Sequence, residues 1–317
     1  MGNGTVISLG QVIVDLTMSV EKIPQPGQDV FADEAGIHVG ASYNTLHAVR
    51  QMGVDARHAG ILGTGPWADT IRRVFESEGI RHVGPTDESV DSGFCVALTD
   101  GTAERHLHLD ARRRSLRRRI HLPKRRTGRW RCRAHLADTP SRTIPARACG
   151  HSCAGPRRIA VPRAVRPVSG GGRHRRRDVR RNGRYRPVWS CNDGRRSSSP
   201  DGWDLPMHQG TFRTLIERMA RRLDSALIVR VGKDGAWLAR PGAEAELVAG
   251  FPVHAIDTNG AGDCHAGVLC AELSRGTGLR EAVGIANAAA AIAVTRRGPA
   301  TCPSRIEVEK LLAMQTL

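Results

Sequence analysis

The sequence has 317 residues, of which 40% are hydrophobic and 4% aromatic, and its formal net charge is +17. This length suits one large α/β domain or two smaller ones. The chain contains no run of about eighteen apolar residues, so no membrane span is expected. Its start lacks the basic and apolar regions of a secretory signal. We therefore expect a cytoplasmic protein that has no membrane partner.

The positive charge is concentrated in one segment. Residues 106–200 hold 28 of the 48 Lys and Arg residues but only 4 of the 31 Asp and Glu residues. The rest of the chain holds 20 basic and 27 acidic residues and is slightly acidic. A strongly basic chain suggests a nucleic-acid-binding protein. This distribution makes nucleic acid an unexpected partner, because two thirds of the chain has the charge of an ordinary soluble protein.

The residues before the basic segment predict regular structure. Residues 5–16 predict a buried strand, and residues 30–39 alternate like a strand with one exposed face. Residues 40–53 predict a helix, with Ser42 as its cap and Gly53 at its end. Four apolar residues fall on one face of this helix: Tyr43, Leu46, Val49 and Met52. Next come a short strand at 56–63, a helix at 66–79 that ends at Gly79, and a hairpin at 93–107.

The C-terminal residues are equally regular. Strands are predicted at 225–232 and 235–240, and helices at 260–273 and 279–298. Strands that alternate with helices indicate an α/β fold with a mostly parallel sheet. The apolar residues between about 106 and 200 follow no such period, so disorder is expected there.

One glycine-rich stretch suggests chemistry. In DTNGAGDCHAG at 257–267, Gly260 and Gly262 flank Ala261 just before a predicted helix. Backbone N–H groups and the helix dipole make such a turn suitable for a phosphate. Asp263 at the helix start is placed to take a proton from a hydroxyl while these N–H groups stabilise a transferred phosphoryl group. The structural alternative is an ordinary helix that follows a tight turn and begins with an Asp.

This stretch resembles the C-terminal signature of the pfkB, or ribokinase-like, carbohydrate kinases. Four more segments resemble motifs of the family in the expected order: residues 9–16, 38–53, 229–238 and 285–303. The resemblance covers about residues 5–105 and 203–315. It implies a three-layer α/β/α fold with a mostly parallel central sheet and a small β lid, through which a homodimer would form. Strands near 11–38 and 91–109 would build the lid.

The resemblance divides the chain into three parts. Residues 1–105 would hold the lid strands and the substrate motif. Residues 106–202 would be an irregular, Arg-rich and aberrant segment. Residues 203–317 would hold the anion hole, the catalytic base and the ATP site.

The resemblance also implies an activity, the ATP-dependent phosphorylation of a hydroxyl of a sugar or nucleoside, with Mg²⁺ and a monovalent cation such as K⁺ as cofactors. Asp263 would be the base, and the anion hole would be formed by Gly260, Ala261 and Gly262. The substrate would be held by Asp15, Gly40 and Asn44. ATP would lie near Gly232, Gly235 and Asn287. The monovalent cation would lie near Asp257, Asn259 and Gly298.

Several of these residues also have structural interpretations. Gly235 and Gly298 could simply turn the chain, and Asn44 could satisfy a buried backbone group. Asp15 is harder to interpret in this way, because an acid at the end of an apolar strand is costly unless it is paired or used.

The chain departs from the family pattern at two places. Val39 stands where the first of two glycines is usual, and Ala41 and Ser42 also differ from the ribokinase pattern, so the identity of the substrate stays open. The acidic motif Asn-x-x-Glu, which is related to magnesium, is absent. At residues 192–195 the chain reads NDGR, with Arg195 in place of the Glu.

The basic segment has the composition that a shift of reading frame would produce. A gene rich in G and C that is read out of frame yields Arg, Pro, Gly and Ala. Synonymous codons for residues 162–167, read in another frame, can encode a buried strand that ends in Asp, and those for 192–201 can restore Asn-x-x-Glu. The hypothesis is a shifted frame from about His106 to about Gly202, with a short in-frame stretch at 189–193.

Two alternative origins of the basic segment stay open. It could be an unrelated disordered insert, or a genuine insertion that makes the chain a non-catalytic nucleic-acid-binding protein on a former kinase fold. Nucleic-acid-binding segments usually interleave aromatic residues with their charges. This segment has only Trp130, Tyr185 and Trp189.

Overall fold

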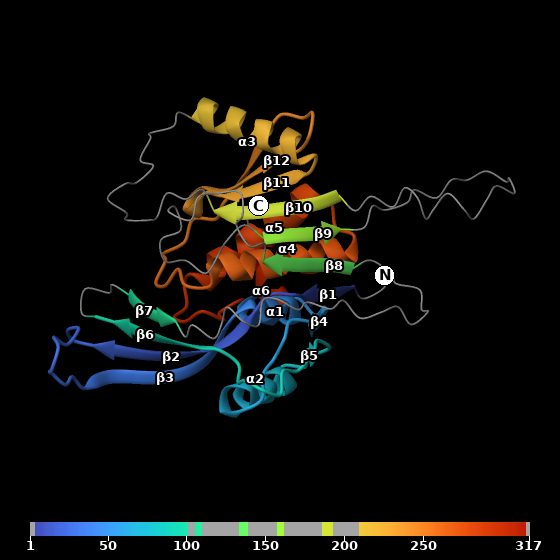
Figure 1. Ribbon diagram of the computed structural model, residues 1–317. Helices are drawn as coiled ribbons and strands as arrows, with labels where there is room; N and C mark the ends of the chain where they lie inside the picture. Colours follow the sequence, from blue (N-terminus) through green and yellow to red (C-terminus); the bar gives the residue numbers. More distant parts are fainter. Residues whose placement is uncertain are drawn as a thin grey trace, which may run out of the picture.

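The computed structural model describes residues 4–100, 105–109, 133–138, 157–161, 186–192 and 209–314, which form a central sheet and a smaller lid sheet (Figure 1). In spatial order the central strands are β13 (Glu246–Ala249), β12 (Gly235–Ala239), β11 (Ala226–Arg230), β10 (Arg186–Asn192), β9 (Arg157–Val161), β8 (Arg133–Asp138), β1 (Thr5–Ser8), β4 (Asp55–His58) and β5 (Arg81–His82). The short 3₁₀ turn Gly232–Asp234 joins β11 to β12.

The central sheet is mixed. β1 pairs in parallel with β4 and β8, β4 with β5, and β10 with β11. β9 is antiparallel to both of its neighbours, and β12 is antiparallel to β11 and β13. The sheet therefore combines parallel ladders with two antiparallel regions, instead of being mostly parallel as the sequence predicts.

Three strands of the Arg-rich segment, β8, β9 and β10, lie between β1 and β11. The structure thus places three strands of the central sheet in a segment that the sequence analysis expects to be irregular. Within the segment β9 is antiparallel to β8 and β10, whereas β8 pairs in parallel with β1 and β10 pairs in parallel with β11. The predicted disorder of the other residues between 110 and 202 lies outside the described residues.

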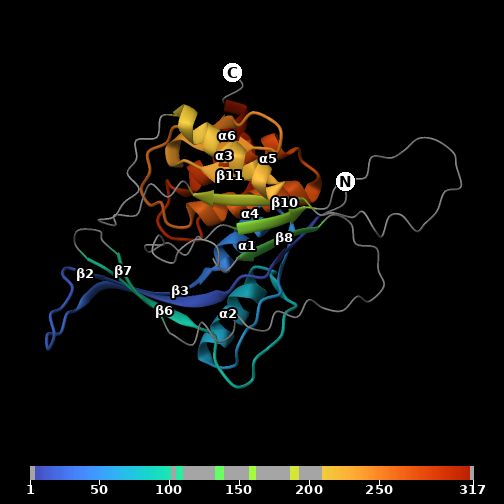
Figure 2. The same ribbon diagram turned by 45° about the horizontal axis from the view of Figure 1, so that its top comes forward.

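Helices cover both faces of the central sheet. On one face, Ile228 of β11 packs with the buried residues of α1 (Ser42–Gln51), α4 (Ala261–Arg275) and α5 (Leu279–Ala293). On the other face, Leu227 and Val229 pack against Phe212 and Ile216 of α3 (Gln209–Leu223). Figures 1 and 2 show α3 and the pair α4 and α5 on opposite sides of the strands. The three-layer α/β/α arrangement is thus confirmed.

The remaining helices flank this core. α2 (Pro66–Ser77) packs against β2, β3 and β5, and α6 (Arg305–Met314) packs against α5. No helix in the described ranges is long and apolar enough to cross a membrane.

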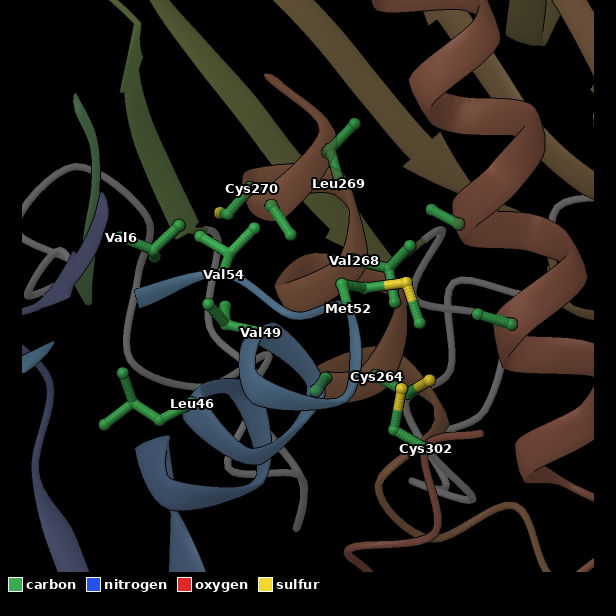
Figure 3. Packing of buried hydrophobic residues seen from close by; sticks show 14 of the residues in the cluster. Val6, Leu46, Val49, Met52, Val54, Cys264, Val268, Leu269, Cys270 and Cys302 are labelled. Atoms are coloured by element: carbon green, nitrogen blue, oxygen red, sulfur yellow. The ribbon is translucent and has the colours of Figure 1, made fainter. Parts of the chain in front are cut away.

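The main core lies between α1 and α4 (Figure 3). Leu46 and Met52 of α1 and Leu269 of α4 are fully buried there. Gly267 makes the close approach possible, because a Cβ at this position would lie 2.4 Å from the Thr45 carbonyl oxygen. The starts of α1 and α4 are therefore neighbours.

Helix α1 largely follows its prediction. The four apolar residues expected on one face are all buried, and Gly53 ends the helix with φ +69. The proposed Ser42 cap is wrong: the N-cap is Ala41, with φ +58, and no side chain caps the helix. Strand β3 (Ala32–Ala41) runs directly into α1, so the sharp turn falls on Ala41 and Ser42 becomes the first helical residue.

The lid is a four-stranded sheet in the order β3, β2 (Val12–Val20), β6 (Phe94–Thr99) and β7 (Arg105–Leu109). Residues 5–16 do not form one strand as predicted. They end β1 in the central sheet at Ser8 and enter β2 of the lid at Val12. The hairpin predicted at 93–107 is confirmed as the antiparallel pair β6 and β7.

Below the lid, β4 carries a buried histidine. His58 is fully buried; its Nε2 lies 3.0 Å from the carbonyl oxygen of Gly10, and its Nδ1 lies 3.1 Å from Nδ1 of His82. A carbonyl can only accept, so Nε2 carries the proton, and Nδ1 accepts from His82. Burial, with a contribution from His82, lowers the pKa of His58 to about 3.

We expect this histidine to make stability depend on pH. The pKa of His58 in the folded chain is below the ordinary histidine value of 6.5. As the pH falls below 6.5, the unfolded chain therefore binds a proton that the folded chain does not, and the free energy of unfolding decreases. Urea denaturation between about pH 8 and 5 should give a smaller slope for His58→Gln than for the unsubstituted chain. The exposed His254 supplies the control, His254→Gln, and equal slopes for all three proteins would contradict the assignment.

Candidate active site

The start of α4 is a tight turn. Gly260 has φ +74, and its carbonyl oxygen accepts the N–H groups of Asp263 at 2.9 Å and Cys264 at 2.8 Å. A Cβ on Gly260 would lie 1.8 Å from the Pro299 carbonyl oxygen. Only glycine fits here. The sequence analysis predicts an anion site at the N-terminus of this 15-residue helix, where backbone N–H groups without an intrahelical partner are expected.

Asp263 is joined to the start of α1. The side-chain amide of Asn44 donates to Oδ2 of Asp263 at 3.2 Å, although 219 residues separate them. Asn44 is buried, and its Oδ1 has no hydrogen-bond partner within the described residues. A buried amide oxygen without a partner is unfavourable in the protein alone. It is an acceptor that a substrate hydroxyl could use.

Asp15 and Gly40 lie together at the base of the lid. A Cβ on Gly40 would lie 2.1 Å from Oδ2 of Asp15, so the carboxylate occupies the space that the glycine leaves open. Gly40 is followed by the turn at Ala41 that starts α1 and carries Asn44. Asp15 therefore lies beside the end of β3, directly before the helix that carries Asn44.

The residues grouped around the expected cation site also lie together. Oδ1 of Asp257 accepts the N–H of Asn259 at 2.8 Å, and Oδ2 accepts the N–H of Gly298 at 2.9 Å. Asp257 therefore connects the loop before α4 with the loop after α5. Among the described residues, no group of three or more His, Cys, Asp or Glu side chains is arranged to hold a metal ion.

The residues expected near ATP lie around the β11–β12 turn. Gly232 has φ +69 and open space around it, whereas a Cβ on Gly235 would lie 2.3 Å from the Val248 carbonyl oxygen. Asn287 is buried, and its amide donates to the carbonyl oxygens of Val248 and Ala249 at 2.9 and 3.0 Å. The side chain of Asn287 thus holds the end of β13.

Arg230 and His265 are two residues that the sequence analysis missed. Arg230 ends β11, and its Nη1 donates to the Gly262 carbonyl oxygen at 3.1 Å. His265 is buried, and its Nε2 lies 3.1 Å from Oδ1 of Asn287. Burial, followed by the positive charge of Arg230, lowers the pKa of His265 to about 3. An Arg at the end of the apolar run ALIV was the available sequence signal.

Two buried thiols also lie at the start of α4. Figure 3 shows Cys264 and Cys302 side by side, and neither is in a disulfide. Burial, reinforced by the hydrogen bond with Cys302, raises the pKa of the Cys264 thiol well above its usual value. The Cys264 thiol is therefore not set up as a nucleophile.

A pocket of about 330 Å³ lies beside the loop after α5. Its lining residues are Ile37, His38, Val39, Tyr43, Val74, Arg297, Pro299, Ala300 and Thr301. It touches neighbours of Gly40 and Gly298 but includes none of the predicted site residues.

Comparison with known proteins shows a similarity to one kinase family. Residues 209–306 match the model described as pfkB family carbohydrate kinase. Over these residues the chain is similar to the pfkB carbohydrate kinases. The matched range contains the α4 turn, Asp263, Asn287 and the loop at Gly298.

One relative spans nearly all of the chain. The chain is 27% identical over 326 residues to the protein of Escherichia coli strain K12 named "Uncharacterized sugar kinase YegV", an alignment that covers 96% of this chain and 92% of that protein.

Solved structures share the fold of this chain. The ribokinase of Cryptococcus neoformans var. grubii serotype A in complex with ADP has a TM-score of 0.65 at 17% identity, over 98% of this chain and 99% of that one. Phosphofructokinase-2 of Escherichia coli in complex with potassium has a TM-score of 0.65 at 15% identity, over 100% of both chains. These structures support the ribokinase-like fold predicted from sequence.

The α4 turn should tolerate no side chain. Gly260→Ala would combine a left-handed backbone with a contact of 1.8 Å to a backbone oxygen, so we expect a loss of about 3 kcal/mol or more of unfolding free energy. The matched control is Gly276→Ala at the other end of α4. Gly276 has φ +93 but no atom within 4 Å of its Cβ position, so about 1–2 kcal/mol should be lost. Urea denaturation measures both, and equal losses would contradict the close approach.

Proposed function

We propose that this pfkB kinase transfers the γ-phosphoryl group of ATP to a hydroxyl of a sugar or nucleoside. The contact between Asn44 and Asp263 carries the proposal. It joins a residue of the substrate motif to the carboxylate that stands at the anion-binding turn. The proposed base Asp263, the proposed substrate-binding residue Asn44 and the proposed phosphate-binding turn of α4 are then neighbours.

Asp263 is the general base of this mechanism. Its carboxylate accepts the proton of the substrate hydroxyl, and the hydroxyl oxygen forms a bond to the γ-phosphorus. The bond from that phosphorus to the bridging oxygen breaks, and ADP leaves with its electrons. Asn44 orients the carboxylate by its hydrogen bond, and the N–H groups of Ala261 and Gly262 stabilise the charge on the transferred group.

The chemistry of the other site residues suits a polyhydroxylated substrate. The carboxylate of Asp15 accepts hydrogen bonds from hydroxyl groups, and the free oxygen of Asn44 offers another acceptor. Gly40 leaves the space that Asp15 occupies. These acceptors favour a sugar or the ribose of a nucleoside without distinguishing between them.

The nucleotide and cations are placed by analogy with the solved neighbours. The Cryptococcus ribokinase was solved with ADP and the Escherichia coli phosphofructokinase-2 with potassium. These two structures support the proposal that ATP binds at the turn of Gly232 and Gly235. They also support a monovalent cation site beside Asp257, Asn259 and Gly298. Each oxygen of Asp257 that accepts a backbone N–H keeps a lone pair for a cation. Mg²⁺, when bound with ATP, would neutralise charge on the phosphates.

The lid also suggests how two copies would associate. Phe31 is 95% exposed and Ile37 is 60% exposed at the edge strand β3. Exposed apolar side chains beside an unpaired edge strand favour contact with a second copy. We propose a cytoplasmic homodimer joined through the lids.

Asp263→Asn should abolish phosphoryl transfer while substrate still binds. The amide oxygen of the new Asn can still accept from Asn44, but it cannot take a proton, so kcat should fall about 10²–10⁴-fold. Binding of the sugar or nucleoside, measured by calorimetry, should change little. Asp69→Asn, which alters an exposed ion pair with Arg72, is the control. A kcat close to that of the unsubstituted enzyme would refute the role of Asp263 as base.

We also propose that residues 106–202 are read from a shifted frame in the chain as written. The alignment with the Escherichia coli sugar kinase supports this, because it covers 96% of this chain and 92% of that protein. The basic segment therefore aligns with the middle part of the relative's sequence and does not make this chain longer than the relative. This favours altered coding over an insertion.

The chain as written should be insoluble or inactive as a kinase. Arg195 replaces the Glu of the metal-related motif, and the segment carries a large positive charge where a sheet needs apolar side chains. Sequencing the gene and expressing this chain beside a frame-restored chain tests the idea. ATP turnover is then measured over a panel of sugars and nucleosides. Equal solubility and equal turnover of the two chains would show that the basic segment belongs to the working enzyme.

A further inference from the structure

Two buried thiols from different segments meet at the start of α4. Cys264 lies in the first turn of this helix, directly after the proposed base Asp263. Cys302 lies in the connection between α5 and α6. The thiol of Cys264 is hydrogen-bonded to that of Cys302, and Figure 3 shows the two side chains next to each other. The contact joins the first turn of α4 to the loop that follows α5.

The arrangement of the two thiols suits a covalent bond between them. Cys302 donates its own hydrogen to the Pro303 carbonyl oxygen at 3.6 Å, so its sulfur is left to accept from Cys264. Neither Cys264 nor Cys302 is in a disulfide in this structure. Two cysteines whose side chains point apart cannot be bridged without a movement of the backbone. Cys264 and Cys302 already direct their sulfur atoms at each other.

The loop that carries Cys302 borders a pocket through which a small molecule can approach. Pro299, Ala300 and Thr301, the three residues before Cys302, line the pocket of about 330 Å³ beside this loop. Burial and the hydrogen bond with Cys302 raise the pKa of the Cys264 thiol, so Cys264 stays protonated at neutral pH. Cys302 is therefore the thiol that meets an oxidant first.

We propose that Cys264 and Cys302 are a redox modification site, at which a peroxide joins the two thiols in a disulfide and thereby switches off the kinase. The thiolate of Cys302 attacks one peroxide oxygen, the O–O bond breaks, water leaves and a sulfenic acid forms. The sulfur of Cys264 then attacks the sulfenic sulfur, the S–O bond breaks, and the hydroxyl leaves with the Cys264 proton as a second water. The two thiols lose two electrons and two protons, which hydrogen peroxide takes up.

The effect on activity rests on the proposed function, and it follows from what the two segments hold. A disulfide brings the sulfur atoms to about 2.0 Å, closer than any hydrogen-bond contact, so the loop is drawn toward α4. The loop has no room for this movement, because a Cβ on Gly260 would lie only 1.8 Å from the Pro299 carbonyl oxygen. The turn before α4 must shift instead, and the Asp263 carboxylate shifts with it.

A purely structural role for the two thiols has different consequences. Free cysteines are among the most buried residues of proteins and pack as small apolar side chains. Two such packing residues would stay reduced when the folded protein meets a peroxide. The chemical state of Cys302 after peroxide treatment therefore separates the two roles, whatever the enzyme's substrate is.

The experiment treats the full chain as written and the frame-restored chain, both folded, with excess hydrogen peroxide. Remaining thiols are alkylated and the protein is digested with trypsin. Mass spectrometry should find the peptide 298–305, which contains Cys302, joined to the peptide that contains Cys264. Dithiothreitol should separate the two peptides.

ATP turnover is measured on the same samples. Oxidation should lower it about tenfold or more, because a small misplacement of a reacting group costs that much, and dithiothreitol should restore it. Cys302→Ser should keep its turnover after peroxide. The control Cys95→Ser removes a buried thiol from strand β6 of the lid, and this variant should be inactivated like the unsubstituted protein.

The outcomes separate this proposal from the proposed function. If peptide 298–305 stays unlinked, if the linked protein keeps its turnover, or if peroxide inactivates Cys302→Ser equally, the proposal is overturned and the proposed function stands. If Cys302→Ser does not fold, Cys264→Ser is judged by the same comparison. If neither untreated chain turns over ATP, the proposed function and the switch both fail, and the peptide map still decides whether the two thiols form a disulfide.

Discussion

The site depends on how closely two helices approach. Gly267 of α4 lies against the backbone of α1 at Thr45, where a Cβ would be 2.4 Å from the carbonyl oxygen. This contact aligns the two helix starts. Asn44 reaches Asp263 for that reason, across 219 residues of sequence. A larger residue at position 267 would push the helices apart and separate Asn44 from Asp263, the proposed base.

The glycines of the site serve different purposes. Gly260 turns the backbone and avoids Pro299, whereas Gly40 makes room for a carboxylate. Gly235 lets the β11–β12 turn approach β13, whose last residues are held by Asn287. In each case the missing side chain lets two segments meet that lie far apart in sequence. A pattern of glycines in one sequence shows that such contacts exist without showing which segments meet.

The local sequence pattern correctly predicted those structural features that depend only on residues close together in the chain. The apolar face of α1, its end at Gly53 and the turn before α4 follow from residues a few positions apart, and they are confirmed. The cap at Ser42 failed because the lid strand enters the helix without a break, and the single strand at 5–16 failed because the chain changes sheets at Gly10. Arg230 and His265 were missed because their partners lie in other elements, at Gly262 and Asn287.

The middle of the sheet shows where pattern and fold disagree. The strands next to the segment, β1 (TVIS) and β11 (ALIVR), are largely apolar, which suits strands covered on both faces. The central strand β9 begins with Arg157 and Arg158 and is antiparallel to both neighbours. Among the described helices α4 packs on β8 and β9, while α3 packs on β11 and β12. Other elements of this fold agree in local pattern and position. A strand such as β9 lies in the middle of the sheet but lacks the apolar residues expected of a strand at that position. A shifted reading frame would produce this combination.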